Sequence, residues 1–186
     1  MSRMLLLIPR MYSEDEFKSF VSILPEDFKV RTLEFWSYVE EKLQGYLGKI
    51  QRVYRDDVCQ GGEEALAYLS SVDHENSLIV KKLVEKGAVF EATEDAALVD
   101  ESKSWLEMVK DNPLDTIPLE LYEETVRERN DYIARRIDET LGDEETGILF
   151  MKPDREINVK EPVKVIKVCR FDPGDYLRSW QVQMNL

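Results

Sequence analysis

The chain has 186 residues, of which 43% are hydrophobic and 34% are charged, and its formal net charge is −13. A chain of this length forms a single domain whose core is large enough to fold without a metal or a disulfide. The negative surface repels nucleic-acid phosphates and anionic membranes, so we expect neither as a partner.

Two features indicate a reducing, cytoplasmic location. The two cysteines, Cys59 and Cys169, stand far apart and outside any CxxC pair, which is typical of free thiols. The first apolar run, residues 4–9, is shorter than the core of a signal peptide, and no run reaches the roughly 18 apolar residues of a membrane span. We therefore expect a protein of the cytoplasm.

In the first third of the chain, continuous apolar runs alternate with segments whose apolar residues are spaced as on one face of a helix. A continuous apolar run closed by Pro9 predicts a buried strand at residues 4–8. Trp36, Val39 and Leu43 repeat at steps of three and four, which predicts an amphipathic helix. The same reasoning gives helices at residues 14–24 and 32–45, a strand at 51–54 and a short helix at 63–69.

The middle of the chain carries capping residues. Asp73 or Glu75 can cap a helix that ends before Gly87, where a left-handed residue is favoured. A third strand follows at residues 88–90. Thr93 is a candidate N-cap for the helix after it.

The longest helix begins near Pro118, where proline is tolerated, and runs to about Leu141. The apolar segment TGILFM at 146–151 predicts a fourth, central strand, and residues 163–168 predict a fifth. Strands separated by helices define an α/β fold. We expect a mostly parallel sheet of about five strands with helices on both faces, in a single domain over residues 1–186.

One residue of the longest helix does not fit its apolar stripe. Arg129 lies three residues after Val126 and four before Ile133, on the same helical face. An unpaired charge in that position costs several kcal/mol, so Arg129 needs a carboxylate partner. The candidates are Asp56, Glu91 and Glu94, which follow predicted strands. The pair is either a structural tie between helix and sheet or part of an anion-recognition or catalytic site.

Acidic residues also gather after the second predicted strand, namely Asp56, Asp57, Glu63 and Glu64. Ligands of parallel sheets bind beyond the carboxyl ends of strands, although a charged loop and helix-dipole acids give the same pattern. The single histidine, His74, cannot form a zinc or cobalt site alone, so only a carboxylate magnesium site stays open. The chain contains no glycine-rich phosphate motif and no GxSxG elbow.

Three segments resemble an uncharacterised family of archaeal and bacterial α/β proteins. They are VYRDDVCQGGEE, ENSLIVKKLVEKGAVFEATEDAALVDE and ERNDYIARRIDETLGDEETGILFM. The last also resembles the TraB and erythromycin-esterase-like superfamily, in which an ERN helix precedes a strand that ends in GxxH. The resemblance covers about residues 54–151 and implies that Asp56, Glu94, Arg129 and Asn130 belong to the shared pattern.

The chain departs from this family at both histidine positions. Family members begin with a strand that ends in IPxxH, and here Tyr12 takes the place of that histidine. The stretch from Lys152 to Arg155 replaces GxxH. The resemblance implies metal-dependent or acid–base chemistry for such histidines, and their loss removes the obvious ligands and bases.

We therefore favour a non-catalytic member, a pseudoenzyme without a cofactor that binds a small anion or a protein partner. The residues expected at its polar pocket are Tyr12, Asp56, Glu94, Arg129, Asn130 and Arg155. The first alternative is a hydrolase in which Asp56 and Glu94 hold magnesium or act as base, while Arg129 stabilises negative charge. The second is a homo-oligomeric interaction protein, such as a homodimer, without a small-molecule site. Its apolar tail would dock on a neighbouring copy, although the same tail can equally pack on its own domain; the tail contains Tyr176, Leu177, Trp180, Val182 and Met184.

Overall fold

A computed structural model describes residues 2–184 and contains one five-stranded sheet in which every neighbouring pair is parallel. The strand order is β3-β2-β4-β1-β5. The strands are β1 (Arg3–Pro9), β2 (Ile50–Arg55), β3 (Val89–Phe90), β4 (Thr146–Met151) and β5 (Val163–Lys167). The expected parallel α/β fold is therefore confirmed, with β4 in the centre.

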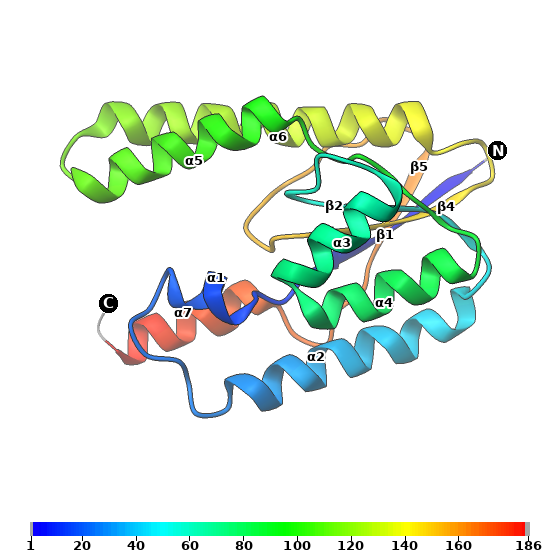
Figure 1. The fold of residues 1–186 in the computed structure, drawn as a ribbon, viewed down its shortest axis with the longest axis horizontal. Coiled ribbons are helices and arrows are strands. Elements are labelled where there is room, and N and C mark those ends of the chain that lie inside the picture. The colour runs from blue at the N-terminus through cyan, green and yellow to red at the C-terminus, as the bar shows by residue number, and fades with distance from the viewer. Residues whose placement is uncertain (1, 185–186) are drawn as a thin grey trace.

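Helices lie on both faces of this sheet (Figure 1). They are α1 (Glu14–Lys18), α2 (Phe28–Leu43), α3 (Gly62–Val72), α4 (His74–Glu85), α5 (Ala96–Asp111), α6 (Thr116–Thr140) and α7 (Pro173–Gln183), with a 3-10 turn η1 (Gln44–Tyr46) after α2. The larger core cluster joins the sheet to α2, α3 and α4, and the smaller one joins it to α6. None of the helices within residues 2–184 is long and apolar enough to cross a membrane.

The C-terminal half of α6 covers the second face of the sheet because its apolar residues repeat at helical spacing. Ile133, Ile137 and Leu141 are buried and pack against sheet residues of the same cluster, which include Leu5, Tyr54 and Leu149. The long helix before the fourth strand is thus confirmed. α5 packs along the N-terminal half of α6 as a helical hairpin (Figure 1).

Two predicted helix starts and one helix end are wrong. α1 ends at Lys18 rather than Leu24, since a turn after Phe17 brings Val21 into the core. α2 begins at Phe28, four residues before the expected start.

The third of these errors concerns the cap of α5. Asp95, not Thr93, caps the helix by accepting a hydrogen bond from the backbone N–H of Leu98. The Thr93 hydroxyl is buried and accepts instead from the backbone N–H of Arg55, at the end of β2. Because the Thr93 hydroxyl is used at the sheet edge, the N-cap of α5 lies two residues later, at Asp95.

The tail, whose apolar residues show no clear period, forms α7. Asp172 caps it, and Pro173 occupies the first helical position. Leu177 is buried in the larger core, and the indole N–H of Trp180 donates to the carbonyl of Ile23 at 2.8 Å. The tail therefore packs on its own chain.

Candidate functional site

The order of the strands places a switch point between β2 and β4. The chain leaves β2 toward β3 at one edge of the sheet, and it leaves β4 toward β5 at the opposite edge. Connections that diverge from neighbouring strands open a crevice beyond their carboxyl ends, where α/β proteins bind ligands. The residues that follow the strands at this edge are therefore the candidate site.

Charged residues follow four of the five strands here. Arg10 follows β1, Asp56 and Asp57 follow β2, Glu94 follows β3, and Lys152 and Arg155 follow β4. Together with side chains from α1, α4, α6 and the end of β2 they form what we call the strand-end network. Its members are Arg10, Glu16, Arg55, Asp56, Asp57, Asp73, Glu94, Arg129, Lys152 and Arg155.

Asp56 lies at the centre of the network and is fully buried. Its Oδ1 accepts from Arg10 Nε at 2.6 Å, and its Oδ2 accepts from the backbone N–H of Lys152 at 3.0 Å. Its own backbone N–H donates to the carbonyl of Phe150 at 3.0 Å. Asp56 thus ties the end of β2 to β1 and β4 across the switch point.

Arg129 extends from α6 into the network, where its guanidinium group donates four hydrogen bonds. Its Nε donates to Glu94 Oε2 at 2.6 Å, its Nη2 to Asp57 Oδ1 at 2.7 Å and its Nη1 to Ser102 Oγ at 2.8 Å. Arg155 approaches the same glutamate from the other side, with Nη1 2.6 Å from Glu94 Oε1. Glu94 therefore accepts from two guanidinium groups at once.

Three carboxyl groups of the network have lowered pKa values, whereas burial raises the pKa of Asp73. Burial alone would raise the pKa of Asp57, but Lys152, Arg10 and Arg129 outweigh it and the net shift is downward. In the same way Arg10 outweighs burial at Glu16 and lowers its pKa to about 2. Burial alone would also raise the pKa of Asp56, but the nearby Arg10 outweighs it and lowers that pKa. Carboxylates with such low pKa values are weak general bases near neutral pH.

The same contacts determine whether Asp56 and Glu94 could hold magnesium, as the hydrolase alternative requires. Both oxygens of Asp56 accept N–H groups, and both oxygens of Glu94 accept guanidinium N–H groups. A hard cation needs free oxygen ligands, so these two side chains do not fit a magnesium site as they are arranged. Within residues 2–184, no three acidic, histidine or cysteine side chains are grouped to hold a metal ion.

Most of the residues expected at the site lie together. Asp56, Glu94, Arg129 and Arg155 share the network, and Asn130 joins it because its Oδ1 accepts from Arg155 Nε at 2.8 Å. Two candidate partners of Arg129 pair with other arginines: Asp56 binds Arg10 within the network, and Glu91 binds Arg52 at 2.6 Å outside it. Glu63 and Glu64 are exposed in the first turn of α3.

Tyr12 lies beside the network rather than within it, and it lines a cavity of about 340 Å³ together with the network residue Asp73. It is buried against the rings of Phe17 and Phe20, in edge-to-face contacts with centroid distances of 6.2 and 5.7 Å. Arg10 instead takes the central place after β1, and Lys152 does so after β4. Arg10 and Lys152 each follow a predicted apolar strand. The same position after a strand made Asp56 a candidate, so this pattern could have identified them too.

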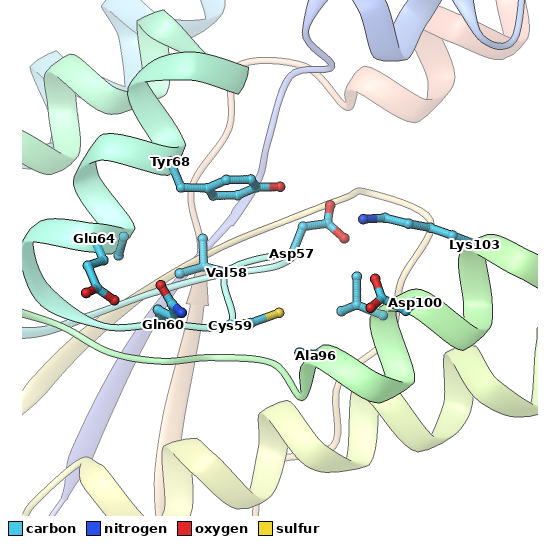
Figure 2. Close-up of a pocket in the computed structure, with 11 residues that line it drawn as sticks. Asp57, Val58, Cys59, Gln60, Glu64, Tyr68, Ala96, Asp100 and Lys103 are labelled. Carbon is cyan, nitrogen blue, oxygen red and sulfur yellow. The ribbon is translucent and has the colours of Figure 1, made fainter.

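Besides the cavity that Tyr12 and Asp73 line, three further cavities adjoin the network. The first, which we call the Cys59 cavity, has a volume of about 300 Å³ and is lined by residues that include Asp57, Cys59, Tyr68, Asp100 and Lys103. Figure 2 shows the Tyr68 hydroxyl and the Lys103 ammonium directed toward the Asp57 carboxylate. Burial and the nearby acids raise the pKa of Cys59 to about 11, so its thiol is a poor nucleophile at neutral pH.

The other two cavities lie on either side of the segment after β4 and share Lys152 and Arg155. The α6 cavity has a volume of about 360 Å³, and its lining includes Tyr122, Val126, Arg127, Arg129, Lys152 and Arg155. The β5 cavity has a volume of about 370 Å³, and its lining includes Leu7, Met151, Lys152, Arg155, Val165 and Lys167. Both volumes fall in the range of small-molecule sites.

Fold and site together define the class of this protein: an α/β protein with an all-parallel five-stranded sheet and a buried ion-pair network at its switch point. Comparison with protein-family models, with curated proteins and with solved structures finds no match for the chain. The resemblance to TraB-like proteins therefore stays a prediction.

Proposed function

We propose that the protein binds a small anion at Arg155 and catalyses no reaction. The observation that carries this proposal is a buried donor without an acceptor. The side chain of Arg155 is 6% exposed, yet its Nη2 has no hydrogen-bond partner among residues 2–184. An unsatisfied buried N–H group costs about 1–3 kcal/mol, more when charged, and an anionic ligand would remove that cost.

The lining of the two cavities beside Arg155 supports an anion rather than a cation. Four basic residues line the α6 cavity against the acids Glu123 and Asp154. Three basic residues line the β5 cavity against Glu156. The chain as a whole carries a charge of −13, so two positively lined cavities are exceptions on its surface. Fixed positive charge in a concave site raises the local concentration of anions.

The hydrolase alternative receives less support from the same residues. A general base needs a pKa near the working pH, whereas the pKa of Asp56 is shifted downward. The oxygens of Glu94 already accept from Arg129 and Arg155, which leaves that carboxylate little freedom to take a proton. These contacts therefore favour a structural or binding role for the network over a role in proton transfer.

Titration calorimetry at low ionic strength tests the proposal with acetate, benzoate, 3-methylbutanoate and inorganic phosphate as probes. We expect at least one anion to bind wild-type protein and to bind the Arg155→Lys variant at least about tenfold more weakly. Lysine keeps the charge opposite Glu94 but lacks the free Nη2 donor. Arg170→Lys, at an exposed position, is the matched control and should bind as wild type does.

Two results would overturn the proposal. The first is that no probe binds, or that binding is equal in the wild type and the Arg155→Lys variant. The second is turnover on a panel of esters, amides and phosphoesters that disappears in Glu94→Gln, because that outcome belongs to the hydrolase.

A further inference from the structure

The β5 cavity has an apolar floor formed by one face of the sheet. The parallel register pairs Leu5 with Val165, Leu7 with Lys167, and Pro9 with Met151, so these side chains point to the same face. α6 covers the part of this face around Leu5 and Leu149. Beside β5, however, Val165 stays 42% exposed. Apolar sheet surface is therefore open directly beside Arg155.

The charges around this floor favour one added negative charge over two. The strand-end network contains five cations, Arg10, Arg55, Arg129, Lys152 and Arg155, and five carboxylates, Glu16, Asp56, Asp57, Asp73 and Glu94. The charges cancel within the network, and Lys167 pairs with Asp172 at 3.1 Å. Every charge of a bound anion is therefore added to a neutral site, and a dianion adds twice as much charge as a monoanion, which is costly where the site is partly desolvated.

We infer that the ligand is a monocarboxylate with a branched or aromatic apolar group, and that it lies in the β5 cavity. Its carboxylate accepts from the free Nη2 of Arg155 after a small side-chain movement uncovers this atom, which has almost no exposed surface in this structure. Its apolar group covers Val165 and the exposed part of Leu7. Burial of this surface contributes roughly 25 cal/mol for each Å² removed from water. This inference rests on the proposed function and names the ligand class of the same site.

The α6 cavity is the competing location. It carries one more basic and one more acidic residue than the β5 cavity and less sheet surface, so it suits a less apolar anion. Inorganic phosphate bound there would be the alternative outcome. A single substitution in each cavity separates the two locations, because Arg127 lines only the α6 cavity and Val165 lines only the β5 cavity.

Calorimetry with benzoate and 3-methylbutanoate, with benzamide as the uncharged analogue and with inorganic phosphate, tests the inference. We expect the two carboxylates to bind and benzamide and phosphate to bind at least about tenfold more weakly. Val165→Asp should weaken carboxylate binding about tenfold or more, whereas Val30→Asp, at an exposed valine of α2, and Arg127→Gln should leave it unchanged. Lys167→Glu, at an exposed side chain of the same cavity, provides a second variant with the same expected direction.

The outcomes separate this inference from the proposed function. Phosphate binding that depends on Arg155 and Arg127 would overturn the monocarboxylate and leave the anion-binding proposal standing. Carboxylate binding that survives both Val165→Asp and Lys167→Glu would overturn the location in the β5 cavity. Absence of binding by every probe would overturn both.

Discussion

Arg129 and Glu94 lie 35 residues apart in the chain and form a two-point ion pair, with Nε 2.6 Å from Oε2 and Nη2 2.9 Å from Oε1. The pair joins α6 to the segment between β3 and α5. Both side chains are buried, so each compensates for the other's loss of water. The long helix is therefore held to the sheet by charge near its middle and by apolar packing along its C-terminal half.

Arg129→Met tests how much the fold depends on this pair. Methionine fills a similar volume but leaves Glu94 and Asp57 without one of their cations. Removal of one partner of a buried ion pair destabilises a protein by about 3–5 kcal/mol. We expect a loss of this size in the free energy of unfolding measured by urea denaturation.

The control is Arg127→Met, two residues away on the exposed side of α6. Surface substitutions of this kind change the free energy of unfolding by about 0.5 kcal/mol or less. Equal stabilities of the two variants would mean that the Arg129 pair contributes nothing measurable to the fold.

Gly147 allows the centre of the sheet to close, and Gly147→Ala tests that requirement. A methyl group here would lie 3.2 Å from both Leu141 Cδ1 and Tyr54 Cε2 and 3.3 Å from Leu5 Cδ1. Overpacking of a filled core costs typically about 1–3 kcal/mol. We expect a loss in this range by urea denaturation. Gly45→Ala, where nothing lies within 4 Å of the added carbon, should not be destabilised, and a similar loss there would refute the packing explanation.

Glu16 makes the fold sensitive to acid. Arg10 and Lys152 outweigh the effect of burial and lower its pKa from 4.5 to about 2 in the folded protein. Between these values the unfolded chain binds more protons, so the free energy of unfolding must fall as the pH falls through this window. The full contribution, on the order of 3 kcal/mol, is present above pH 4.5 and is lost near pH 2.

Urea denaturation at pH values from about 2.5 to 6 measures this dependence. In Glu16→Gln the slope of stability against pH should be shallower than in wild type, because one depressed carboxyl group no longer titrates. Glu107→Gln, at an exposed position of α5, is the control and should keep the wild-type slope. Parallel curves for wild type and Glu16→Gln would refute the assigned role of Glu16.

The sequence was sufficient where a pattern is local. The apolar run at 146–151 gives a buried central strand because continuous burial needs continuous apolarity. Helical spacing also placed Arg129 on the buried face of α6 and so indicated a carboxylate partner. Both inferences depend only on neighbouring residues.

The sequence was insufficient where strand order matters. Arg10, Asp56 and Lys152 meet because β1, β4 and β2 are adjacent, although they are distant in the chain. No local pattern states that order, so the partner of Asp56 was not identified. The expected place of Tyr12 rested on alignment with a family pattern, whereas its contacts with Phe17 and Phe20 carry it into an aromatic cluster.

The tail provides the last prediction, because the sequence left two roles open for it. If α7 stabilises its own chain, Leu177→Ala should cost about 2–4 kcal/mol, since Leu177 is buried in the larger core. Val182→Ala, on the exposed side of the same helix, should change the free energy of unfolding by about 0.5 kcal/mol or less. Light scattering of both variants and the wild type should give one common mass. A lower mass for Val182→Ala than for wild type would instead show that the exposed side of α7 joins two copies of the chain.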